Sequence, residues 1–460
     1  MPGIEAATDL AYVRMKMEEA APPPARVSGA IGWLRQNLFS NWVNTIFTLI
    51  ALWIIWSVVG PLVKFALIEA VWTGSDRTAC ATEEQGGIQP NGWFGACWPY
   101  VKAYFAQFIY GRYPVDARWR VDLVFILFVV GIVPMLIPSA PFKRENILYM
   151  VAVFPFAALL LLTGGNFDYG SFLGAGRAIT QSGDLGFAID YVILTGLICA
   201  ALSLWGRATG SDAASSIRLA LTVMAVIAVL LLILGVDLGM RPVRTELWGG
   251  LLTTLVIAVT GIAASLPLGV LLALGRRSRM PIVRGVCICF IEFWRGIPLI
   301  SVLFMSSVML PLFLPEGVTF DKLLRALIGV ALFSAAYMAE VIRGGLQAIP
   351  RGQYEGAEAV GLAYWQKMRL IILPQAIKIV IPGIVGNFIG LFKDTTLVLI
   401  IGLFDFLGQI QSSFTDPTWS SPVQATTAYL FAAMVYWVFC FSMSRYSMYT
   451  EHRLDTGHRH

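Results

Sequence analysis

Four charged residues stand in segments that are otherwise apolar enough to lie in a lipid bilayer. Glu292 and Arg295 occur in one such segment, and Lys393 and Asp394 occur in another. A guanidinium group binds a carboxylate through two parallel hydrogen bonds, and ionisable groups inside a membrane mark functional sites by default. These residues are therefore candidates for a functional site, in which Arg295 is suited to bind a carboxylate and Asp394 or Glu292 is suited to bind a cation.

Backbone interruptions near these charges favour the same interpretation. Gly296 loosens one helix and Pro298 removes a backbone hydrogen bond from it, which is tolerated at that depth only beside protein or a water-filled cavity. Thr395 supplies a hydroxyl, and Asn387 supplies an amide that either bonds across helices or lines the path. The predicted substrate pathway comprises Glu292, Arg295, Gly296, Pro298, Asn387, Lys393, Asp394 and Thr395.

The charges also have a structural interpretation, which the sequence leaves open. Glu292 and Arg295 are three residues apart, so they share a helix face and can neutralise each other. The charges of the second segment can pair with neighbouring helices. Glu340 and Arg343 have the same spacing near the end of another apolar segment, where a helix-end ion pair is the preferred interpretation.

Composition places the chain among integral membrane proteins. Of its 460 residues, 57% are hydrophobic and 13% are charged, whereas about 25% of the residues of a soluble chain are charged. The net charge of +5 fits basic cytoplasmic loops, and no basic cluster is interleaved with aromatic residues, so no nucleic-acid partner is expected. No metal site is expected either, because the histidines all lie in the polar C-terminal tail: His452, His458 and His460.

Apolar segments long enough to span a bilayer, about 20 residues each, recur along the whole chain. We predict an all-α integral membrane protein with about ten transmembrane helices. Lys and Arg residues collect in the inner loops if both termini are cytoplasmic. The predicted spans are roughly 43–67, 121–138, 148–164, 189–205, 219–236, 249–274, 286–314, 323–342, 376–404 and 425–443.

A polar stretch, residues 350–374, separates two of these spans. Good helix formers are broken at Gly361, which predicts two short helices with a turn between them, and Pro374 is expected to end the second helix. On polarity alone this would be an ordinary solvated loop. One face of the first helix is expected to present negative charge and small side chains outward to a partner: Glu355, Ala357, Glu358 and Ala359.

The spacing in this stretch resembles the cytoplasmic coupling loop, or EAA motif, of ABC-importer permeases. It reads Glu355-x-Ala357-x3-Gly361-x9-Ile371-x-Leu373-Pro374, and Gly356 stands where the family usually has alanine. The sequence RGIPL from Arg295 and the sequence KDTTL from Lys393 resemble the RGTPL and KDTSL elements of polar amino-acid permeases. The resemblance covers residues 245–445, and the long N-terminal half is most similar to the general L-amino-acid permease branch.

This resemblance implies the five-helix core of a type I ABC importer permease in the bacterial inner membrane. Its expected partners are ABC ATPase subunits, a homologous second permease and a periplasmic substrate-binding protein that delivers L-amino acids. The chain has no G-x-x-x-x-G-K-[ST] motif, so we expect no catalysis and no cofactor in it, with ATP and Mg bound by the ATPase. The implied ATPase-coupling residues are Glu355, Ala357, Glu358, Gly361, Leu373 and Pro374.

The predicted domain organisation divides the chain near residue 240. We expect a cytoplasmic segment at 1–42, a membrane extension at 43–240 with a periplasmic loop at 68–120, a permease core at 241–445 and a polar cytoplasmic tail at 446–460. In the periplasmic loop, Cys80 and Cys97 are 17 positions apart. They could form a disulfide in an oxidising compartment or be two free, buried cysteines, and the sequence favours neither.

Two other functions compete with an ATP-driven permease. An ion-coupled secondary amino-acid transporter, with Asp394 or Glu292 carrying a proton, explains the charges in the membrane but not the spacing from Glu355 to Pro374. A membrane-embedded enzyme would need a nucleophile, a base or metal ligands clustered at one depth, and the predicted spans contain no histidine.

Overall fold

The structure, a computed structural model, describes residues 29–167, 169–209, 213–313 and 320–454. Within these ranges it contains helices and isolated β-bridges but no β-strand, which confirms the all-α fold class. The α-helices are α1 (Gly29–Asn37), α2 (Trp42–Val63), α3 (Trp98–Tyr110), α4 (Arg118–Leu136), α5 (Lys143–Leu148), α6 (Phe154–Thr163), α7 (Ala175–Ile179), α8 (Gly183–Thr209), α9 (Ala213–Gly235), α10 (Gly250–Arg276), α11 (Pro281–Gly296), α12 (Leu299–Phe304), α13 (Lys322–Ala348), α14 (Arg351–Ala359), α15 (Tyr364–Lys367), α16 (Leu373–Asp394), α17 (Phe406–Ser412) and α18 (Gln424–Leu454).

Nine helices in the described ranges are long and apolar enough to cross a membrane, and a tenth span results if the bent pair α11 and α12 counts as one. Every predicted span overlaps one of them, so the prediction of about ten transmembrane helices is confirmed. The helix α18 continues to Leu454 and so includes the first part of the predicted cytoplasmic tail, which stays a prediction. Residues 1–28 of the predicted N-terminal segment and residues 455–460 of the tail lie outside the described residues.

The chain contacts divide the protein into two compact units. In the first unit, residues 92–96 return to the end of α2: the backbone N–H of Ala96 donates to the Phe65 carbonyl at 2.8 Å, and the Trp93 indole donates to the Glu69 carbonyl at 2.8 Å. The helix α2 buries none of its side chains, as expected for a helix whose apolar surface is solvated by lipid.

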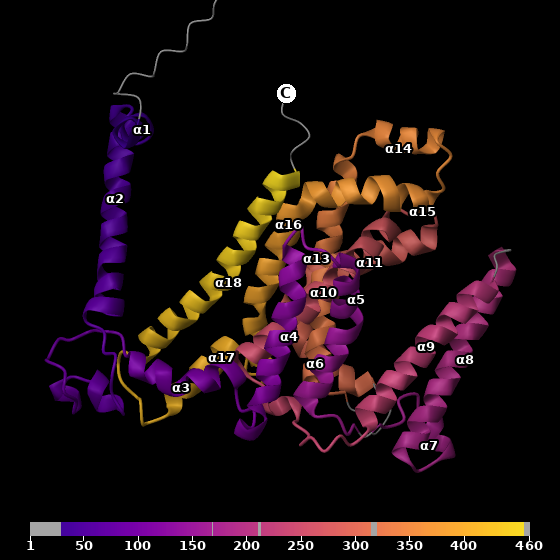
Figure 1. Cartoon of the computed structure of the whole chain (residues 1–460), viewed down its shortest axis with the longest axis horizontal. Coiled ribbons are helices and arrows are strands. Elements are labelled where there is room, and N and C mark those ends of the chain that lie inside the picture. Colours follow the sequence, from indigo (N-terminus) through magenta and orange to yellow (C-terminus); the bar gives the residue numbers. More distant parts are fainter. Residues whose placement is uncertain (1–28, 168, 210–212, 314–319, 455–460) are drawn as a thin grey trace, which may run out of the picture. The chain divides into compact units, whose positions relative to one another are not determined.

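The second unit is built around α10, α13 and α16, and Figure 1 shows these helices side by side at its centre. Small residues let the helices approach closely. A Cβ atom added at Gly345 of α13 would lie 2.6 Å from the Ala376 carbonyl of α16, so no larger residue fits there. The close approach places the end of α13 and the start of α16 in one buried cluster with Ile342, Leu346 and Ile372.

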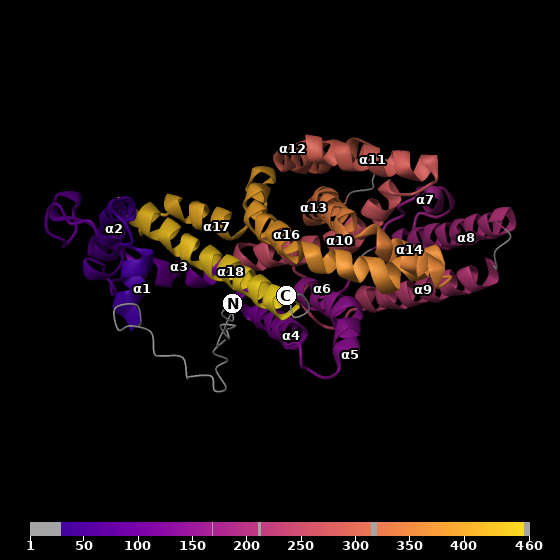
Figure 2. The same ribbon diagram turned by 90° about the horizontal axis from the view of Figure 1, so that it is seen from above.

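A sharp bend separates α11 from α12. The two helices meet at 104° across Ile297 and Pro298, and Figure 2 shows them along one edge of the second unit, beside α13. Gly296 is the last residue of α11, and Pro298, which has no N–H to donate, is the residue before α12. The predicted break in this span is therefore present.

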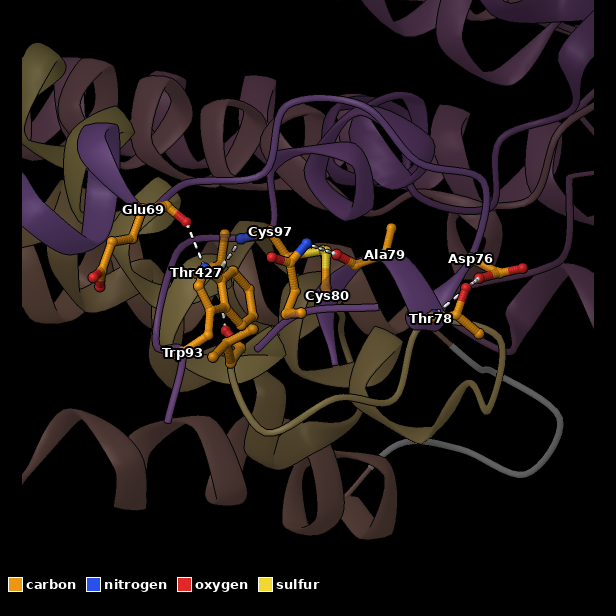
Figure 3. The surroundings of a disulfide bond; sticks show 10 residues. Glu69, Asp76, Thr78, Ala79, Cys80, Trp93, Cys97 and Thr427 are labelled. Atoms are coloured by element: carbon orange, nitrogen blue, oxygen red, sulfur yellow. Dashed lines mark hydrogen bonds between the residues drawn. A yellow bond between two sulfur atoms is a disulfide. The ribbon is translucent and has the colours of Figure 1, made fainter. Parts of the chain in front are cut away.

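A disulfide joins Cys80 to Cys97 in the segment that precedes α3, with the Cα atoms 5.7 Å apart. Figure 3 shows this bond beside Thr427 of α18, whose hydroxyl accepts a hydrogen bond of 3.0 Å from the Cys97 backbone. The N–H of Arg77 donates to the Thr418 carbonyl at 2.9 Å. The cross-linked segment is thus attached to the connection between α17 and α18.

Aromatic residues of α3 strengthen this attachment. Tyr100 is fully buried and bonds to Ser413. The Tyr104 hydroxyl donates to Asp416 and thereby lowers the pKa of that carboxyl. Of the two alternatives that the sequence left open for Cys80 and Cys97, the structure has the disulfide, and the bonded segment packs with α3 against α10, α17 and α18.

We expect the disulfide to stabilise this segment by constraining its unfolded state, typically by about 2–4 kcal/mol. In Cys80→Ser/Cys97→Ser, trypsin should cleave faster after Arg77 and Lys102, which are exposed in the native protein. After reduction, denatured wild-type protein should take up two more maleimide labels than before it. The double variant should take up the same number of labels with and without reduction. Equal labelling of the wild type with and without reductant would contradict the bond.

Candidate functional site

Residues 350–374 form a helical hairpin with a tight turn at Gly361. The first arm is α14, and Gly361 follows it in the left-handed conformation, with φ of 78°. The N–H of Gly361 donates to the Glu358 carbonyl at 2.9 Å, and the N–H of Leu362 donates to the Ala357 carbonyl at 3.2 Å. These two bonds form a Schellman motif, for which glycine is favoured because its backbone reaches positive φ without strain. The predicted turn is present.

The face of α14 that carries Ala357 points inward, which corrects the prediction that this residue is presented to a partner. Ala357 is only 2% exposed. Glu358 pairs with Lys367 on the second arm, and the ammonium group of that lysine holds the pKa of Glu358 below its usual value of 4.5. The pair closes the hairpin because it joins α14 to the second arm. Glu355 remains exposed, as predicted.

Pro374 does not end the second helix, contrary to the prediction. A continuous helical segment runs from Tyr364 through Pro374 to Ile401. Residues Met368–Ile372 form a π-helical turn that ends two residues before the proline. A proline within a helix cannot donate to the carbonyl four residues earlier and clashes with it; the wider π turn, in which each N–H reaches back five residues, accommodates this change. The hairpin is therefore joined rigidly to α16.

The outward surface of the hairpin combines charged groups with several apolar side chains. Val360, Trp365 and Leu370 are 79%, 65% and 64% exposed, and they accompany the exposed Glu355. A Cβ atom added at Gly356 would meet nothing within 4 Å, so packing within the chain does not require glycine at this position. Such a surface can bind a partner through apolar burial and directed charges.

The charges of α11 and α13 form one group, here called the ion cluster, with an arginine of α10. Glu340 lies at its centre and is only 15% exposed. Its carboxylate contacts Arg343 at 2.7 Å, Arg276 at 2.8 Å and Arg295 at 3.7 Å. Arg276 also contacts Glu292 at 2.9 Å. Three guanidinium groups against two carboxylates leave one net positive charge in the cluster.

The ion cluster changes the predicted pairing of two residues. Glu292 and Arg295 do not neutralise each other, because Glu292 pairs with Arg276 and Arg295 pairs with Glu340. The Arg295 guanidinium also lies 5.8 Å from the centre of the Tyr337 ring. Arg295 has the longest ion-pair distance in the cluster, is 37% exposed and stands one residue before Gly296 at the break. It is thus the arginine that is most free to bind a carboxylate.

The polar residues of α16 differ from one another in their surroundings. Within the described ranges, the Nδ2 atom of Asn387 is buried without a hydrogen-bond partner, and the side chains of Lys393 and Asp394 have no ion-pair partner. Asn387 and Asp394 are seven residues apart and share a helix face. Thr395 is only 1% exposed, and its hydroxyl donates to the Phe392 carbonyl at 2.9 Å, so it is not available to a ligand in this conformation.

Sequence reasoning missed Arg276, Arg277, Tyr354 and Lys367 as parts of the site. The two arginines end a predicted span, where basic residues are expected on orientation grounds alone. One signal pointed to Arg276: carboxylates in apolar segments, such as Glu292 and Glu340, require cationic partners. The sequence does not say which neighbouring helix supplies those partners.

Known proteins are similar to this chain over most of its length. Residues 265–456 match the family model described as the inner membrane component of binding-protein-dependent transport systems. The inner membrane amino-acid ABC transporter permease protein YhdY of Escherichia coli (strain K12) is 43% identical over 438 residues, which cover 95% of this chain and 96% of the relative.

The glutamate/glutamine/aspartate/asparagine transport system permease protein BztC of Rhodobacter capsulatus is 43% identical over 465 residues, which cover 98% of this chain and 100% of the relative. A solved structure, described as an amino acid ABC transporter with histidines, has 29% identity and a TM-score of 0.39. It covers 44% of this chain and 92% of its own.

We expect Glu340→Gln to destabilise the protein more than Glu292→Gln. Glu340 is shielded and contacts three arginines, so its neutralisation leaves buried cations without a partner, which typically costs about 3 kcal/mol. Glu292 is 54% exposed and contacts only Arg276, and pairs of that kind contribute about 1 kcal/mol or less. Free energies of unfolding measured in detergent micelles check the order of the two variants, and equal losses would contradict it.

Proposed function

This chain belongs to the amino-acid ABC transporter permeases, to which it is similar over almost its whole length, and we propose that the hairpin of residues 350–374 couples it to a separate ATPase. The chain is the membrane-spanning permease subunit of an ATP-driven amino-acid importer, and it lies in the inner membrane as a multi-pass protein. Its family is one of transport permeases, and in this proposal the chain itself catalyses no reaction. ATP and Mg are bound by the partner ATPase in this proposal.

The hairpin is the observation that carries the proposal. Its motif residues have separate structural roles: Gly361 makes the turn, Ala357 packs inward, and Leu373 packs against the buried cluster under the hairpin. Glu355 is left exposed among apolar side chains, as a surface for a protein partner requires. A movement imposed on this surface would reach α16, because Pro374 does not interrupt the helix between them.

We propose that the ion cluster and α16 line the pathway for polar L-amino acids. Arg295 would bind the carboxylate of the substrate, and Asp394 would bind its ammonium group, with Asn387 adding a hydrogen bond. Recognition of the groups that all amino acids share leaves the side chain weakly selected, which suits a broad substrate range. The break at Gly296 and Pro298 supports this reading, because irregular backbone within a membrane lines a site or a cavity.

The partners follow from the same proposal. A homologous second permease would complete the pathway, two ATPase subunits would bind the hairpins, and a periplasmic substrate-binding protein would deliver the amino acid. Both termini and the hairpin would then be cytoplasmic, and the disulfide-linked segment before α3 would be periplasmic. Residues 241–445 would be the permease core, and residues 43–240 would be an extension with its loop at 68–120.

The test compares Glu355→Lys/Gly361→Asp with wild type in the complex reconstituted into vesicles. Reversal of an exposed charge and strain at the turn should disrupt the ATPase contact. Loss of one interface anchor costs about 2 kcal/mol or more, so binding of the ATPase in a pull-down and ATP-driven uptake should both fall at least about tenfold. Glu84→Lys, which reverses an exposed charge in the segment before α3, is the control and should change neither.

Intact ATP-driven uptake in the double variant would overturn the coupling role of the hairpin. Uptake that an uncoupler abolishes but that persists after ATP depletion would instead support the ion-coupled alternative. Uptake by the double variant thus tests whether the hairpin is the coupling element, and uptake with an uncoupler or after ATP depletion tests the energy source.

A further inference from the structure

A second contact of the hairpin involves Tyr354 and has no counterpart in the predicted coupling motif. The Arg277 Nη1 atom donates to the Tyr354 hydroxyl at 2.9 Å and to the Leu346 carbonyl at 3.2 Å. The Tyr354 hydroxyl donates to the same carbonyl at 3.1 Å. The guanidinium group also lies 5.4 Å from the centre of the Tyr354 ring. These three residues, here called the Tyr354 triad, join α14 to α10 and α13.

The triad satisfies a backbone group that the helix itself cannot. Leu346 is among the last residues of α13, which ends at Ala348, and the last four carbonyls of a helix have no partner within it. The Leu346 side chain is only 1% exposed, so the carbonyl stands beside a packed core. A cation at this position also interacts favourably with the helix dipole.

The other side-chain hydrogen bonds of α14 go elsewhere. Gln353 accepts from Gln375, and Glu358 pairs with Lys367. Both of those contacts join α14 to the continuous helical segment that leads into α16. Among the described residues, Tyr354 is thus the residue through which α14 makes polar side-chain contact with α10 and α13.

The position of Arg277 links the hairpin to the ion cluster. The preceding residue, Arg276, binds Glu340 of α13 and Glu292 of α11. Successive helix residues point in directions about 100° apart, so the end of α10 holds the hairpin with one arginine and the charged residues of two further helices with the other. A displacement of α14 acts on both groups through one rigid helix end.

We propose that the Tyr354 triad transmits movement of the hairpin to α10 and, through Arg276, to the ion cluster beside the bend of α11 and α12. This inference rests on the proposed coupling function of the hairpin and adds a second route to the one through α16. Tyr354 is a positioning residue: it holds the hairpin in register with α10 and α13 and need not touch the ATPase.

The experiment uses Tyr354→Phe in the complete reconstituted complex. This variant removes the hydroxyl but leaves the ring packing, the cation–π contact and the bond from Arg277 to the Leu346 carbonyl. ATPase binding and ATP hydrolysis should stay within about twofold of wild type. The amino acid taken up per ATP hydrolysed should fall by about fivefold or more, the lower end of typical coupling between distant sites.

Tyr449→Phe is the matched control. Tyr449 lies near the end of α18, is 51% exposed and makes no side-chain hydrogen bond to a described residue. Loss of its hydroxyl should leave uptake per ATP unchanged. Arg277→Gln should lower the ratio as Tyr354→Phe does, and the double variant should be no worse than Arg277→Gln alone, because residues that act as one unit are not additive.

Three results would overturn the triad's role. Uptake per ATP that is unchanged in Tyr354→Phe would show that the contact carries no coupling. Loss of ATPase binding in Tyr354→Phe would show that this tyrosine is a docking contact for the ATPase. Additive losses of uptake per ATP in the double variant would show that Tyr354 and Arg277 act independently. Each of these results leaves the proposed function intact if Glu355→Lys/Gly361→Asp still loses the ATPase; retention of uptake by that variant would remove the proposed function itself.

Discussion

The need to neutralise Glu340 fixes the relative positions of three helices. A carboxylate in the apolar part of a membrane protein is costly unless cations are close, and Glu340 obtains them from α10, α11 and its own helix. This requirement holds α10 and α11 against α13 and keeps Arg295 next to the bend. The close packing of α13 against α16, where Gly345 meets Ala376, adds the fourth helix. The hairpin then rests on the end of this group.

Features that depend on a single segment could be predicted from the sequence. A run of about 20 apolar residues specifies a span because a bilayer demands that length. Gly361 specifies the turn of the hairpin because a helix commonly ends with a glycine in the left-handed conformation. Gly296 and Pro298 specify the break because they weaken the backbone hydrogen bonds of one helix. None of these predictions depends on which helices are neighbours in the fold.

Features that depend on packing between segments could not be predicted in the same way. Spacing showed that Glu292 and Arg295 share a face, but their partners come from α10 and α13, far away in the sequence. The inward position of Ala357 depends on the cluster under the hairpin, and the continuity of the helix at Pro374 depends on a π turn that no local rule requires. The burial of Thr395 has the same origin.

The two routes from the hairpin into the membrane differ in their mechanics. The route through Pro374 is covalent and helical, so it moves α16 as a lever whatever the state of the ion cluster. The route through Tyr354 is a set of hydrogen bonds to the ends of α10 and α13, and it acts only while those bonds hold. Because α16 carries Asp394 and α10 supports the cluster that holds Arg295, each route ends at one of the two groups that we propose to bind the amino acid. Movement of one hairpin would then change the distance between the group that binds the carboxylate and the group that binds the ammonium, which is what loading and release of an amino acid require.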